Sequence, residues 1–274
     1  MRSRLKWLAL GLLLTGSCGA LAQDNYEIQV YGAETVAPGS TMLEFHTNYT
    51  ANGRRFGLNG VSPTEHAVHE TVEITHGFTD WFETGFYIFT SAGAGQGWAW
   101  VGDHVRPRFR IPERWHWPVG VSLSTEIGYQ RPLFSEDTWT LEIRPIVDKQ
   151  LGRWYLAVNP AFERSLAGLN TAQGFAFSPN AKISYELLKQ ADIGLEYYGG
   201  LGPVTGLNPL AEQQQQIFPA VDLNLSPRWE VNFGVGVGVT RSTDHLIVKT
   251  IIGYRFDRLP LMHKSGWGRH QLPN

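Results

Sequence analysis

Apolar and polar residues alternate with a period of two along most of the chain. From Val119 to Gln130, Val, Leu, Ile and Tyr occupy one face, and Gly, Ser, Glu and Gln occupy the other. The same alternation runs from Trp229 to Val239 and from Leu246 to Phe256. Successive side chains of a β-strand point to opposite faces, so each segment predicts a strand with one apolar face. No apolar run after residue 22 has the length of a transmembrane helix.

Segments of this kind recur roughly twelve times, each about 9 to 13 residues long, which is the length that a tilted membrane strand needs. The predicted strands are 40–50, 66–77, 81–91, 101–111, 119–130, 138–149, 154–165, 175–187, 191–199, 214–225, 229–240 and 245–256.

The links between these strands alternate between long and short. Residues 50–65, 92–100, 165–174 and 199–213 form long links, and the intervening links are mostly tight turns. Long loops at one end and short turns at the other are typical of outer-membrane barrels. We therefore predict an all-β fold, a closed antiparallel transmembrane β-barrel of about twelve strands covering residues 39–256.

Five prolines fall inside predicted strands, on the apolar face. Proline lacks a backbone donor and is usually confined to edges and bulges, whereas a closed barrel has no edge. We expect bulges or kinks at these positions. They are Pro107, Pro145, Pro160, Pro179 and Pro219.

The N-terminus has the features of an export signal. Basic residues precede an apolar run, and a small-x-small motif ends at Ala22, which predicts a signal peptide over 1–22 with cleavage after Ala22. Cleavage at Cys18, the only cysteine, is the lipoprotein alternative. We expect residues 23–38 to form a periplasmic lead-in and residues 257–274 a periplasmic tail.

The net charge of the exported chain bears on its partners, while the strand pattern and the export signal predict its location in a Gram-negative outer membrane. Removing the three basic residues before Gln23 changes the formal net charge from −2 to −5. A mildly acidic chain gives no reason to expect nucleic-acid binding.

Tryptophan lies near the predicted strand ends. Trp81, Trp154 and Trp229 open strands at the short-turn end, and Trp139 lies near the opposite end. We interpret them as an aromatic girdle in contact with outer-membrane lipid. The alternative is a soluble exported β-sandwich or barrel in which tryptophan anchors an ordinary core.

Short motifs resemble known outer-membrane proteins. Residues 253–256 (Gly-Tyr-Arg-Phe) resemble the closing strand that the barrel-assembly machinery recognises, with Phe256 as the terminal aromatic residue. Residues 102–109, 159–162 and 178–185 resemble the putative outer-membrane transporters linked to phenol-degradation operons. That resemblance implies passage of small molecules and identifies no particular solute.

The predicted inward face is strongly charged. We expect these side chains to line the lumen and set its selectivity, so that replacing Arg106, Arg108 and Arg110 by Gln shifts selectivity toward cations. The lumen-lining residues are His104, Arg106, Arg108, Arg110, Glu126, Glu142, Arg144, Asp148, Lys182, Glu196 and Lys249.

The pattern predicts passive passage of a small solute through a narrow charged lumen. The alternative is a closed barrel, filled by salt bridges, with a structural or assembly role.

We expect no cofactor and no metal. The odd spacing of His66 and His69 puts them on opposite faces of a strand, which disfavours joint ligation. We also expect no enzyme activity, because the chain has no Gly-x-Ser-x-Gly motif and no evident Ser-His-acid arrangement.

Overall fold

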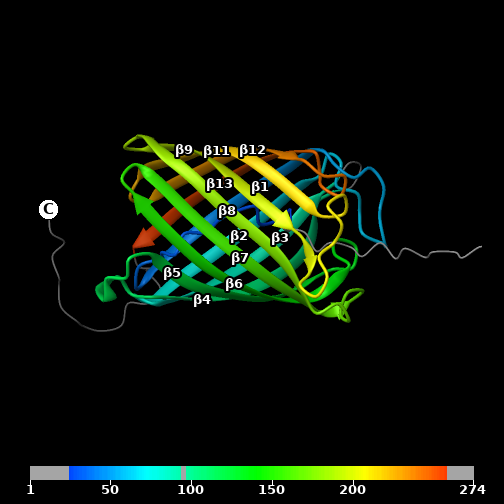
Figure 1. Cartoon of the computed structure of the whole chain (residues 1–274), viewed down its shortest axis with the longest axis horizontal. Helices are drawn as coiled ribbons and strands as arrows, with labels where there is room; N and C mark the ends of the chain where they lie inside the picture. The colour runs from blue at the N-terminus through cyan, green and yellow to red at the C-terminus, as the bar shows by residue number, and fades with distance from the viewer. Residues whose placement is uncertain (1–24, 94–96, 258–274) are drawn as a thin grey trace, which may run out of the picture.

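The computed structural model describes residues 25–93 and 97–257. Within them the chain folds as a closed antiparallel β-barrel of twelve long strands, as predicted (Figure 1). The strands are β1 (Ser40–Asn52), β2 (Val68–Thr79), β3 (Phe82–Ala92), β4 (Ala99–Arg110), β5 (Gly120–Gln130), β6 (Asp137–Leu151), β7 (Trp154–Gly168), β8 (Phe175–Leu188), β9 (Ala191–Gly200), β11 (Gln214–Ser226), β12 (Trp229–Gly238) and β13 (Leu246–Asp257).

Each strand pairs with its neighbour in sequence, and pairing of β1 with β13 closes the ring. A two-residue strand, β10 (Gly202–Pro203), pairs with the end of β8. A 3-10 turn, η1 (Glu113–Trp115), lies in the link between β4 and β5. Among the described residues, no helix has the length and hydrophobicity needed to cross a membrane.

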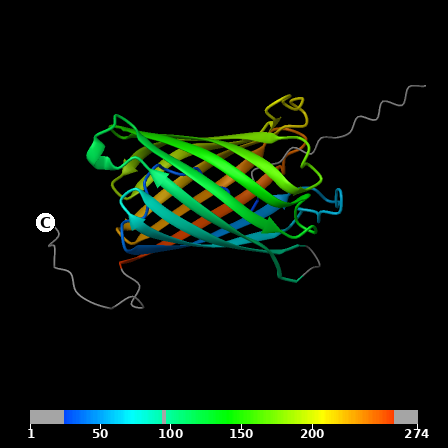
Figure 2. The same cartoon turned by 90° about the horizontal axis from the view of Figure 1, so that it is seen from below.

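The two ends of the barrel differ as the sequence predicts. One end, called here the long-loop end, carries loops such as 53–67 and 201–213. The other, the short-turn end, carries two-residue links such as 152–153 and 227–228, and β13 ends there. The strands cross obliquely between the two ends (Figure 2).

The outward face of the barrel is apolar. Phe45, Phe86, Ile127 and Leu195 are each between 42% and 50% exposed, whereas the residues beside them in sequence point inward. The burial classes alternate along most of the long strands, in agreement with the predicted inward and outward faces. An exposed apolar surface of this extent needs an apolar environment around it.

The five strand prolines face outward and interrupt the pairing locally. Pro145 of β6 and Pro160 of β7 lie in a gap between the pairs Ile143–Phe162 and Val147–Val158. Pro160 in turn is paired with Pro179 of β8, so three prolines lie side by side on neighbouring strands. Three of the five missing donors are thus gathered in one part of the wall.

Residues 25–38 do not lie outside the barrel, and the expected periplasmic lead-in is wrong. Asn25 is at the long-loop end, where its side chain donates to Asp244, and Gly39 donates to Gly77 at the short-turn end. The segment between them runs inside the barrel along its length. We call residues 25–38 the luminal segment.

Apolar packing explains why this segment is inside. Its side chains alternate in the order Tyr26, Ile28 and Val30, and all three are no more than 7% exposed. They pack against inward-facing wall residues such as Phe89 and Phe218. Burial of apolar surface stabilises a fold by about 25 cal/mol for each Å² removed from water, so the packing of these side chains favours the position of the segment inside the barrel.

The described residues do not include the segments that carry two other expectations. Cleavage after Ala22 and nearly all of the tail 257–274 lie outside them. Phe256 lies at the end of β13, where the terminal aromatic residue was expected.

Candidate functional site

The lumen is the candidate site, and the luminal segment lies along its axis. Backbone groups of the segment bond to side chains of seven strands, among them Asn48 of β1, which donates to the Asn25 carbonyl. Asn159 of β7 contributes most, because its Oδ1 accepts from the Tyr31 N–H at 2.7 Å and its Nδ2 donates to the Tyr31 carbonyl at 2.9 Å. Other contacts follow along the segment: Thr71 to the Tyr26 carbonyl, Lys249 to the Ile28 carbonyl, Arg108 to the Gly32 and Glu34 carbonyls, the Ala33 N–H to Asp148, and the Val36 N–H to Glu83.

Tyr31 of the luminal segment contacts the wall through its ring as well as its backbone. Its ring lies within 4.9 Å of the Arg106 guanidinium carbon, 5.8 Å of that of Arg108 and 5.2 Å of that of Arg144. A guanidinium over an aromatic face is attracted by the ring quadrupole. The Tyr31 hydroxyl also donates to Glu27.

The predicted arginine row lies inside the barrel, but its charges are paired. Arg106 Nη2 lies 2.5 Å from Glu73 Oε1, and Arg108 Nε lies 2.7 Å from Glu83 Oε1. Arg110 pairs with Glu113 of η1 at the short-turn end. The row therefore joins the wall to the luminal segment and does not present three free charges.

Two further charged clusters contain the other predicted lumen residues except Asp148, which accepts from the Ala33 N–H and the Tyr155 hydroxyl. His104 hydrogen-bonds Glu126, and Arg144 pairs with Glu142 at 2.7 Å. On the opposite wall, Lys249 and Lys182 both form ion pairs with Glu196. Lys182 also pairs with Asp222 at 2.7 Å. Buried charges need such partners because transfer out of water is costly.

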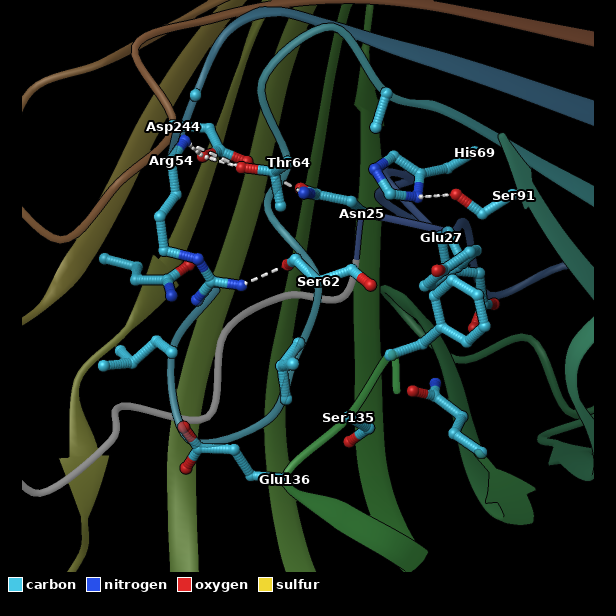
Figure 3. A pocket seen from close by; sticks show the side chains of 18 of the residues that line it. Asn25, Glu27, Arg54, Ser62, Thr64, His69, Ser91, Ser135, Glu136 and Asp244 are labelled. Atoms are coloured by element: carbon cyan, nitrogen blue, oxygen red, sulfur yellow. Dashed lines mark hydrogen bonds between the residues drawn. The ribbon is translucent and has the colours of Figure 1, made fainter. Parts of the chain in front are cut away.

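A cavity of about 570 Å³ opens within the barrel at the long-loop end. Its lining combines wall residues such as His69 and Ser91 with Asn25 and Glu27 of the luminal segment (Figure 3). Seven acidic side chains and three arginines line it. The cavity thus carries a net negative charge where the luminal segment begins.

Loop 53–67 forms one side of this cavity and is tied down by Asp244. Asp244 Oδ1 accepts from the Arg54 N–H at 3.1 Å and from the Thr64 hydroxyl at 2.7 Å, as Figure 3 shows. Asp244 Oδ2 accepts from the Asn25 side chain at 2.9 Å. In the same loop, the Gly53 N–H bonds Glu65 and lowers the pKa of that carboxyl. One aspartate therefore joins two loops and the luminal segment.

The four predicted girdle tryptophans all face outward. Trp81, Trp139, Trp154 and Trp229 are between 42% and 49% exposed. All four contact another aromatic residue, and in three the partner is a tyrosine: Trp154 with Tyr185, Trp229 with Tyr254 and Trp139 with Tyr129. Trp81 stacks on Phe109.

The residues that the sequence predicts to line the lumen lie on the inward face of the wall, but sequence reasoning missed the luminal segment. The alternation of Tyr26, Ile28 and Val30 could have revealed it. Three apolar side chains at a period of two indicate a segment with one buried face, which a solvent-exposed lead-in would not need. Sequence reasoning also gave no sign that Glu73 and Glu83 pair with the arginine row.

Comparison with known proteins gives structural likeness only. No protein-family description and no curated protein matched the sequence. Among solved structures, the KdgM porin superposes with a TM-score of 0.52 at 10% identity, covering 78% of this chain and 99% of the porin. The COG4313 outer membrane channel from Pseudomonas putida F1 gives 0.53 at 12% identity, covering 84% of this chain and all of that one. The NanC porin gives 0.52 at 8% identity, covering 79% and 100%. These likenesses confirm the twelve-stranded barrel.

Proposed function

We propose that this protein is a passive channel for small polar solutes in the outer membrane of a Gram-negative bacterium. The observation that carries the proposal is the cavity of about 570 Å³ at the long-loop end, because it gives a solute access to the interior of a closed barrel. The barrels that it resembles are named as porins or as an outer membrane channel. A channel, and not an enzyme, is the role that this geometry favours.

The outer surface supports the membrane location. An apolar band flanked by aromatic residues at both ends suits contact with outer-membrane lipid. In this orientation the long loops face outward and the short turns face the periplasm. Export with cleavage after Ala22, and assembly through the strand that ends at Phe256, belong to the same proposal.

The luminal segment would form the constriction of this channel. It lies between the outer cavity and the short-turn end and bonds to the wall along its length. A solute would pass beside it, or after it moves. The predicted role of the charged lumen residues in selectivity therefore depends on this segment. Passage of small molecules, which the resemblance to the phenol-operon transporters implies, depends on it too.

Single-channel recording tests the proposal directly. The mature chain in a planar bilayer should give discrete conductance steps. A variant in which residues 26–36 are replaced by an equal number of Gly and Ser residues should give steps several-fold larger, because it keeps the chain length but loses the packing and the anchored side chains. Equal conductance in the two proteins would show that the luminal segment does not limit the path.

A closed structural barrel is the second candidate. The hydrogen bonds that hold the luminal segment, together with the buried ion pairs around it, favour this reading. If neither protein conducts while both migrate as folded, heat-modifiable barrels on a gel, the structural role is supported and the channel proposal fails.

A further inference from the structure

Three potential metal ligands converge on the inner face of β1 and β2. Glu44 and His46 are two residues apart on β1, so both point into the barrel. Glu73 lies directly opposite Glu44 on β2. One ligand atom from each residue lies within 4.8 Å of the other two, and all three residues are buried.

Glu44 has no counterion in this part of the barrel. Three arginines near it are each committed to another carboxylate, and Glu44, 6% exposed, forms no ion pair or hydrogen bond among residues 25–93 and 97–257. A buried carboxylate without a partner is costly, so a cation here would be favourable. The committed pairs are Arg106–Glu73, Arg108–Glu83 and Arg255–Glu230.

His46 supplies a nitrogen donor next to this carboxylate. Its side chain is fully buried, and neither ring nitrogen forms a hydrogen bond among the described residues. Nε2 lies 3.5 Å from Glu73 Oε2. Arg106 binds the other oxygen of Glu73, which holds that carboxylate in place and leaves Oε2 directed toward His46.

The short-turn end of the barrel is hollowed near these residues. A second cavity of about 330 Å³ there is lined by Glu230 and Arg255. Glu230 and Glu44 lie on either side of Gly253, with their Cγ atoms 2.9 and 3.3 Å from the place that a Cβ of Gly253 would occupy. The glycine thus makes room for these two side chains and for the methyl group of Met42, whose Cε is the nearest atom to the same place, so that Glu44 is a close neighbour of a residue that lines the cavity.

We propose that Glu44, His46 and Glu73 bind a divalent transition-metal cation, with Zn²⁺ the best fit. One imidazole and two carboxylates form a mixed nitrogen and oxygen set that Zn²⁺ accepts. Mg²⁺ fits poorly because it prefers oxygen ligands and loses water reluctantly. Spacing between histidines alone does not reveal the site, because two of its three ligands are glutamates. The site does not depend on whether the barrel conducts.

Calorimetric titration of the mature chain tests the proposal. The protein, without a histidine tag, is stripped with EDTA, dialysed in detergent and titrated with ZnCl₂, with MgCl₂ in parallel. We expect one Zn²⁺ per chain and far weaker Mg²⁺ binding. Glu44→Gln and His46→Gln should each lower the Zn²⁺ affinity at least tenfold.

Glu230→Gln is the matched control, because it removes the same charge beside the site but none of the three ligands. It should keep affinity within a few-fold of the wild type. Wild-type affinity in both Glu44→Gln and His46→Gln would overturn the proposal, and so would an equal loss in Glu230→Gln, which would indicate diffuse attraction of cations.

X-ray absorption of the zinc-loaded wild type gives a result that does not depend on how the variants fold. The proposal expects one nitrogen and two carboxylate ligands. A shell of several imidazoles, or of water alone, would place the zinc elsewhere and contradict it.

Discussion

At the residue scale, Asn159 is the side chain that makes both backbone hydrogen bonds to Tyr31. In Asn159→Ala the buried N–H and C=O of Tyr31 lose their partners, at a cost of about 1–3 kcal/mol for each unsatisfied group. We expect the luminal segment to loosen and the single-channel current to become larger or noisier.

Asn180→Ala is the control for that variant. Asn180 is paired with Asn159 on the neighbouring strand and is equally buried, but its side-chain amide has no hydrogen-bond partner among the described residues. It should leave the current unchanged. Equal currents in the two variants would mean that Asn159 does not hold the segment.

Arg106 tests the consequence of pairing in the arginine row. Its side chain is 3% exposed and bonded to Glu73, so Arg106→Gln leaves a buried carboxylate uncompensated. Breaking a buried pair in this way costs about 3–5 kcal/mol. We expect a clear fall in the urea concentration that unfolds the barrel in micelles, an effect larger than any change in selectivity.

The exposed pair Arg228–Asp257 supplies the comparison, since both side chains are more than half exposed. Surface pairs contribute about 0–1 kcal/mol, so Arg228→Gln should shift unfolding little. If Arg106→Gln were equally mild, the buried pair would not be a major contributor to stability.

At the scale of elements, the molecule consists of a wall of twelve strands and of the luminal segment and loops that the wall holds. In the wall, Pro145, Pro160 and Pro179 lie side by side, so that three of the five missing backbone donors fall in one region, where the pairing of β6 with β7 is interrupted. The luminal segment is bonded to that wall along its length, and Asp244 joins the start of the segment to loop 53–67.

Asp244→Ala should free loop 53–67. The variant removes the acceptor that Arg54, Thr64 and Asn25 share. We expect trypsin to cut after Arg55, which is exposed, several-fold faster than in the wild type. Asp103→Ala, which removes only a bond from Trp100 at the same end, should leave the cutting rate unchanged.

At the scale of the whole molecule, charge is distributed unevenly inside the barrel. The outer cavity has seven acidic side chains against three arginines. If the barrel conducts, the reversal potential in a KCl gradient should show a preference for K⁺ over Cl⁻. This preference should weaken at high salt, because screening reduces the range of the cavity's electrostatic field.

Glu163→Gln should reduce that preference, because Glu163 lines the cavity. Asp257→Asn removes one negative charge from the exposed pair with Arg228 and should leave the preference unchanged. Anion selectivity in the wild type would show that the paired basic residues deeper in the lumen control the field.

The sequence by itself determined the wall. Alternation from Val119 to Gln130 is a local property, since each residue's face follows from its neighbours two positions away. The strand number, the outward tryptophans and the inward row from His104 to Arg110 could therefore be read without coordinates.

Only the tertiary structure decided what fills the barrel and which charges meet. Tyr31 lies against Asn159, which is 128 residues away in the sequence, and Arg106 meets Glu73 across β3. Glu44, His46 and Glu73 come together through the register of β1 on β2. Such contacts depend on closure of the ring and on the path of residues 25–38 through it, and the local alternation of residues carries no information about either.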